Sequence, residues 1–122
     1  MPQTIYEKYG GFSAISRVVM TFYELALESD QIGGYFEDVD MPRLIDHQTK
    51  FISSLLGGPA SFSDARLETV HRALGISHAD FDEMAALLRE ALAQHGVSEP
   101  DIRQTLAAIE SKRGLIVARS AA

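Results

Sequence analysis

A histidine lies inside an apolar stripe in the segment 67–74. His71 belongs to a set of residues that recur at spacings of three, four and seven, and such residues share one helix face. The other members are Leu67, Val70 and Leu74. A buried imidazole needs a hydrogen-bond partner or a metal, since leaving it unpaired costs about 1–3 kcal/mol. Taken alone, the segment allows a core histidine bonded to the backbone or a metal ligand.

Two other expected helices also carry polar side chains among apolar ones. Gln48 lies in the middle of a stripe between residues 40 and 56, and His47 is one residue round that helix. Within the stripe, Gln48 is flanked by Leu44, Phe51, Ile52 and Leu55. Tyr23 lies at the edge of the stripe of an earlier helix. An apolar wall with a few converging polar groups is the usual makeup of a small-molecule or cofactor site.

The number of available ligands indicates which cofactor would fit. Zinc normally needs three or four protein ligands, and no acidic residue stands at ligand spacing beside His47 or His71. A haem needs one axial histidine, an apolar slot lined by aromatic residues and a distal polar group facing the bound gas. A haem therefore fits this sequence better than zinc does.

The bulk properties exclude several classes of function. The chain has 122 residues, of which 46% are apolar and 23% charged, as expected for one globular domain over residues 1–122. A net charge of −6 and the absence of any basic run beyond Lys112-Arg113 make nucleic acid an unfavourable partner. No cysteine is present, which excludes disulfides and thiolate metal sites. No signal pattern or 18-residue apolar run appears, so we expect a soluble, cytoplasmic protein without membrane contact.

The elements that must position these residues are all expected to be helices. We expect a turn at 4–8 and helices at 13–28, 40–56, around 71, at 77–96 and from 98 towards 118. Ser13, Asp40, Ser77 and Ser98 are the expected N-caps, and the glycines at 57, 75 and 96 the expected stops. No strand-length alternation appears between hairpin turns. The fold class is therefore all-α.

Taken together in this order and spacing, the residues resemble those of the group I truncated haemoglobins over about residues 5–117. The segments that carry the resemblance are YEKYGG (6–11), Phe22-Tyr23, YFEDVDM (35–41), HQTKF (47–51), LGGP (56–59) and Val70-His71. The resemblance implies a two-over-two helical sandwich around a haem. It also implies O₂, NO and CO as ligands and an external electron donor or reductase as partner.

The resemblance also implies roles for individual residues. His71 matches the proximal iron ligand, and Phe36 the aromatic that wedges the haem. Tyr23 matches the phenol that donates to bound dioxygen, with Gln48 as its companion. Leu44 stands where many globins have a distal histidine. The remaining expected haem contacts are Phe51, Leu67, Leu74 and Phe81.

For two basic residues, His47 and Arg43, the sequence allows two different roles each. In some cyanobacterial members a histidine matching His47 coordinates the iron when no gas is bound, so His47 is either a second axial ligand or a residue at the pocket edge. Arg43 matches a position that meets a haem propionate, and the alternative is a solvated helix face.

Two departures from the family pattern affect the cofactor site. Relatives usually carry an aromatic–x–Gly turn before the proximal helix, whereas this chain has Phe62-Ser-Asp64, so the loop there is expected to take another path. No histidine follows His95, where some relatives attach the haem covalently, so we expect non-covalent haem b.

The sequence thus predicts a haem protein that binds dioxygen and other diatomic gases, with nitric oxide dioxygenation as a candidate activity. One alternative is a hexacoordinate redox or gas-sensing globin with His47 and His71 on the iron. A second is a cofactor-free helical interaction domain in which Gln48 and His71 form a buried polar network. We expect a monomer or a weak homodimer.

Overall fold

In the computed structural model, residues 3–58 and 76–117 are described, and these parts of the chain are helical without strands. The elements are α1 (Ile5–Lys8), α2 (Phe12–Glu28), the 3₁₀-helix η1 (Gly33–Phe36), α3 (Met41–Leu55), α5 (His78–Gln94), α6 (Glu99–Glu110) and α7 (Arg113–Ile116). No helix within the described ranges is long and apolar enough to cross a membrane.

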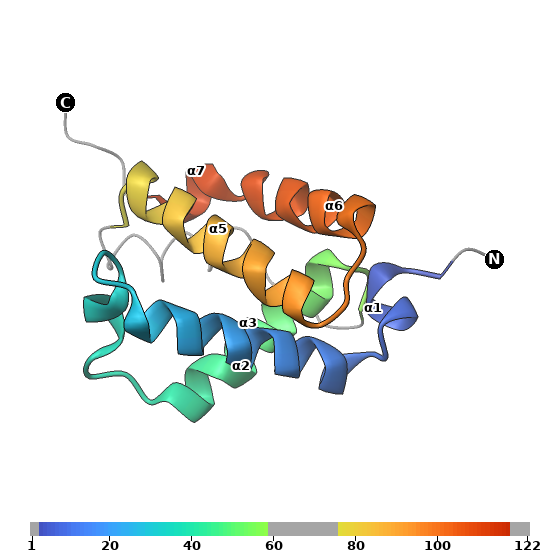
Figure 1. The fold of residues 1–122 in the computed structure, drawn as a ribbon, viewed down its shortest axis with the longest axis horizontal. Coiled ribbons are helices and arrows are strands. Elements are labelled where there is room, and N and C mark those ends of the chain that lie inside the picture. The colour runs from blue at the N-terminus through green and yellow to red at the C-terminus, as the bar shows by residue number, and fades with distance from the viewer. Residues whose placement is uncertain (1–2, 59–75, 118–122) are drawn as a thin grey trace.

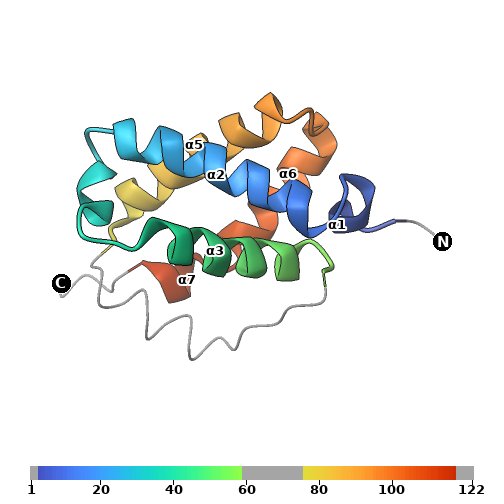
Figure 2. The ribbon, with the colours of Figure 1, turned by 90° about the horizontal axis from the view of Figure 1, so that it is seen from below.

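The helices form two packed pairs. Helix α2 packs against α3 and also against α5, while α5 packs against α6. Figure 1 shows the α5–α6 pair lying over the α2–α3 pair, and Figure 2 shows α3 running below α2 in the turned view. This two-over-two arrangement confirms the expected all-α fold. Buried aliphatic residues such as Val19 and Leu92 fill the space between the pairs.

Local capping explains where the long helices begin and end. The Asp40 side chain accepts a hydrogen bond from the Arg43 amide, and the Ser77 hydroxyl accepts one from the Asp80 amide, as predicted. Gly57 and Gly96 follow α3 and α5 with φ of 94° and 79°. Only glycine adopts this left-handed backbone without strain, so the helices stop there.

Three local expectations were wrong. Helix α2 begins at Phe12 with Gly11 as its N-cap, not at Ser13, because Gly11 takes a φ of 77° and turns the chain directly into the helix. Gly33–Phe36, which fall between two expected helices where none was predicted, form the short helix η1. The last helix is broken at 111–112, where the Lys112 amide bonds the Ile109 carbonyl at 2.9 Å in a tightened turn.

Candidate functional site

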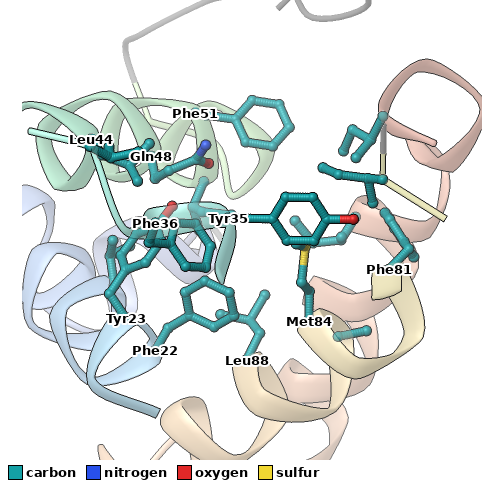
Figure 3. A pocket seen from close by; sticks show the side chains of 17 residues that line it. Phe22, Tyr23, Tyr35, Phe36, Leu44, Gln48, Phe51, Phe81, Met84 and Leu88 are labelled. Atoms are coloured by element: carbon teal, nitrogen blue, oxygen red, sulfur yellow. The ribbon is translucent and has the colours of Figure 1, made fainter. Parts of the chain in front are cut away.

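A largely apolar cavity of about 300 Å³ lies between α2, η1, α3 and α5. Figure 3 shows its side chains converging from these elements. The lining residues are Val19, Phe22, Tyr23, Tyr35, Phe36, Val39, Leu44, Gln48, Phe51, Ile52, Ile76, Phe81, Met84, Ala85, Leu88, Ile109 and Ile116. Six of these side chains are aromatic rings, so the cavity offers flat apolar walls.

Tyr23 is the buried phenol of this cavity. Only 5% of the residue is exposed, and its ring meets those of Phe22 and Phe36 edge to face, with centroids 4.9 and 5.4 Å apart. Burial raises the pKa of Tyr23 far above its usual range, because the phenolate would lose its hydration. The hydroxyl therefore stays protonated as a donor, and it has no hydrogen-bond partner among the described residues.

Helix α3 supplies the second polar group of the cavity. Leu44, Gln48 and Phe51 follow at spacings of four and three, so one face of α3 carries all three into the lining. The Gln48 amide has no hydrogen-bond partner in the described part of the chain. Figure 3 shows Gln48 and Tyr23 entering the cavity from two different helices. Both polar groups thus point into an apolar space that a ligand would fill.

A phenol–carboxylate hydrogen bond ties the cavity wall of η1 to α5. The Tyr35 hydroxyl donates to the Asp80 carboxylate at 2.5 Å, and the Gln31 amide donates to the other oxygen at 2.9 Å. The bond to Asp80 raises the pKa of Tyr35 to about 12, and the bond from Tyr35 lowers the pKa of Asp80. Sequence reasoning missed Tyr35 and Asp80 as a pair, because they are 45 residues apart. The two adjacent aromatic residues at 35–36 were the only local feature of the sequence that could have indicated this cavity wall.

The opposite wall of the cavity is held by α5 and α7. Phe81, Met84 and Leu88 recur at helical spacing on α5 and line the cavity. The Arg113 guanidinium lies over the Phe81 ring at 4.3 Å from its centroid. Because Arg113 also forms ion pairs with Asp82 and Glu110, it fixes α7 against this wall.

Not every predicted site residue reaches the cavity. Tyr23, Phe36, Leu44, Gln48, Phe51 and Phe81 line it. His47 and Arg43 are exposed on α3 and do not line it. Coordination of an iron by His47 therefore needs a different side-chain placement from the one observed. His71, Leu67 and Leu74 lie outside the described residues, so their roles stay predictions.

The described residues fit a haem better than a protein-ligated metal ion. Within them, no group of three or more His, Asp or Glu side chains could hold a metal ion. A haem needs little from these elements beyond flat apolar walls and a polar group on one side. The aromatic lining supplies the walls, and the unpartnered Tyr23 hydroxyl and Gln48 amide supply the polar groups.

Comparisons with known proteins agree with this geometry. Residues 4–117 match the bacterial-like globin family. The chain is 32% identical over 112 residues to the group 1 truncated haemoglobin of Tetrahymena pyriformis, covering 92% of this chain and 93% of that protein. It is 35% identical over 108 residues to that of Mycolicibacterium paratuberculosis, covering 88% and 79%.

Solved structures of related proteins have the same fold. The Fe(III) form of the truncated haemoglobin from Tetrahymena pyriformis superposes with a TM-score of 0.87 at 30% identity, covering 96% of this chain and all of that one. The 2/2 haemoglobin of Synechococcus, in the cyanomet state with covalently attached haem, superposes with a TM-score of 0.88 at 26% identity and the same coverage.

Proposed function

Because the chain belongs to the bacterial-like globin family, as a group 1 truncated haemoglobin, we propose that it binds dioxygen and other diatomic gases at a non-covalently held haem b and converts nitric oxide to nitrate. Membership in this family makes it a haem protein and argues against the cofactor-free interaction domain. The haem would supply the iron that binds the gas and gives up one electron, which an external reductase has to return.

The observation that carries the proposal is the pair of polar groups in the apolar cavity. The Tyr23 hydroxyl is protonated, buried and without a partner in the described part of the chain, so it is available to donate to a diatomic ligand. A hydrogen bond to a charge-bearing acceptor contributes about 1.5–3 kcal/mol. Gln48 enters the same space and can donate a second bond or orient the phenol.

This arrangement suits chemistry on the bound gas better than its delivery. Each 1.4 kcal/mol of added stabilisation slows release about tenfold, so a ligand held by Tyr23 stays long enough to meet a second molecule. The aromatic walls would keep water out of the space around it. Dioxygen and nitric oxide would combine there into nitrate.

Rapid mixing of the oxygenated protein with nitric oxide tests the activity. We expect nitrate in stoichiometric amount to haem, with the iron left in the ferric state. The CO-saturated protein is the matched control and should give no nitrate, because dioxygen is absent. Formation of a ferrous nitrosyl protein without nitrate would refute the dioxygenase activity while leaving haem and gas binding intact.

A further inference from the structure

A second cavity, of about 180 Å³, lies at the end of the molecule where α1 meets α2. Its walls come from α1, the first turns of α2, the C-terminal end of α5 and the chain that leads into α6. Figure 1 shows these segments gathered at one end, with η1 at the other. The second cavity shares no lining residue with the larger one, so the two are separate candidates for ligands.

The floor of the second cavity is aliphatic and buried. Ile15, Val18, Leu92 and Val97 line it, and each is at most 9% exposed. A floor of this kind favours an apolar group over water, at about 25 cal/mol for each Å² that the ligand buries. An apolar cavity of about 150 Å³ has room for a benzene ring. The floor therefore has room for a group of about that size.

The mouth of the second cavity carries a cation and an imidazole. Arg17 lines the cavity and is exposed, and its guanidinium forms no ion pair with a carboxylate of the described residues. The His95 Nε2 lies 2.7 Å from the Thr21 hydroxyl, and Thr21 is one helical turn beyond Arg17 on α2. This bond holds His95 on the same side of the mouth as Arg17.

The far rim does not neutralise that positive charge. The Tyr9 hydroxyl lines the cavity and donates to Asp101 at 2.6 Å, while it accepts the Ser98 amide at 3.1 Å. The Asp101 carboxylate is itself paired with Lys8 at 2.8 Å. Since Lys8 already balances Asp101, the Arg17 charge is left for a ligand.

We propose that the second cavity binds a small organic monocarboxylate whose apolar body is about the size of one ring. The carboxylate would accept hydrogen bonds from the Arg17 guanidinium, which has a planar set of donors suited to it. The apolar body would lie on Ile15, Val18 and Val97. Both parts are needed, because the exposed guanidinium alone gives little affinity.

Benzoate is the probe that tests this site. The CO-saturated holoprotein is titrated with benzoate and followed by amide chemical shifts, because the occupied haem cavity then offers no competing apolar space. We expect saturable shifts at Ile15, Val18 and Val97. Benzamide keeps the ring without the charge, and acetate keeps the charge without the ring. Each should bind at least fivefold more weakly than benzoate.

Matched arginine variants separate the site from general surface charge. Arg17→Gln should weaken benzoate binding at least fivefold. Arg103→Gln removes an equal charge from a residue that is 70% exposed on α6 and should leave binding unchanged. Neither residue belongs to the haem cavity. The CO-form Soret band therefore serves as the folding check for both.

A cavity-filling variant tests the floor independently. Ala14→Leu adds carbon atoms inside the cavity while leaving Arg17 in place, so benzoate should lose its binding. The proposal is overturned if benzamide or acetate binds as tightly as benzoate. It is equally overturned if Arg17→Gln and Arg103→Gln have the same effect, or if the shifts fall outside this end of the molecule.

Discussion

The two cavities of the molecule place their polar groups in opposite ways. In the larger cavity, neutral groups, the Tyr23 hydroxyl and the Gln48 amide, enter an aromatic space from buried or half-buried positions. In the smaller one, Arg17 and His95 stay exposed at the mouth and the interior is aliphatic. Buried neutral donors suit a flat cofactor and a small polar gas, because they stay dry and uncharged. A charge at the mouth suits an anion whose head remains in water.

The largest expected effect concerns the residue that would bind the iron in the larger cavity. His71→Ala should abolish tight haem binding, because the coordinate bond would be lost and apolar contacts alone would remain. Haem transfer to apomyoglobin and the Soret maximum measure this. His47→Ala is the control, since His47 is exposed and away from the lining. Retention of the wild-type Soret maximum by His71→Ala would contradict the assignment.

The same control variant tests the hexacoordinate alternative. Because His47 is exposed and does not line the cavity, the reduced protein without gas should show one broad high-spin band that His47→Ala leaves unchanged. Split low-spin bands that disappear in His47→Ala would instead place His47 on the iron.

The next largest effect concerns the buried phenol. Tyr23→Phe should raise the O₂ dissociation rate at least tenfold, because it removes a hydrogen bond to a charge-bearing acceptor. The cofactor-free protein should not lose stability, since the hydroxyl has no partner among the described residues. Stopped-flow ligand replacement measures the rate. An unchanged O₂ dissociation rate would remove Tyr23 from this role.

A smaller effect is expected where η1 is tied to α5. Asp80→Asn replaces the carboxylate that accepts from Tyr35 and Gln31, so the cavity wall should loosen and haem loss should quicken about fivefold. The folded-state pKa of Asp80 is lowered, mainly by the Tyr35 bond. Its stabilisation is therefore present above the ordinary value of about 3.9 and is lost as the pH falls below it. Wild-type and variant haem-loss rates should converge at acidic pH.

Glu83→Gln provides the matched control for Asp80→Asn. Glu83 accepts from Ser29 in the same loop but does not bond a residue that lines the cavity. Faster haem loss in Glu83→Gln than in Asp80→Asn would show that the loop, not the Tyr35 bond, holds the wall.

The smallest effect concerns the rim of the second cavity. The hydrogen bonds from Lys8 and then Tyr9 lower the pKa of Asp101 to about 2. Asp101 therefore stabilises the fold above about pH 4, and this contribution is lost as the pH falls towards 2. Asp101→Asn should flatten the decline of the unfolding free energy over that window, as measured by urea denaturation. If the unfolding free energy of Asp101→Asn declines with falling pH as steeply as that of the wild type, the Lys8–Asp101 pair does not contribute to stability.

The helices and much of the larger cavity were predictable because their signals are local. Caps at Asp40 and Ser77 and the stop at Gly96 are set by neighbouring backbone. The spacing of Leu44, Gln48 and Phe51 is enough to place all three on one face.

The remaining features of the two cavities could not be predicted, because they depend on contacts between distant segments. The bond of Tyr35 to Asp80 and the bond between Thr21 and His95 join residues that no local pattern pairs. On α3, His47 lies at the edge of the face that carries Leu44, Gln48 and Phe51 into the cavity. Periodicity therefore could not decide whether His47 is exposed.

Titration of the cofactor-free protein with haemin, followed by reduction and addition of CO, tests the central claim most directly. We expect saturation at equimolar haemin and a Soret band that sharpens and shifts on CO binding, with a gain in thermal stability because haem binds only the folded chain. A protein that takes up no haemin while remaining fully folded would contradict it.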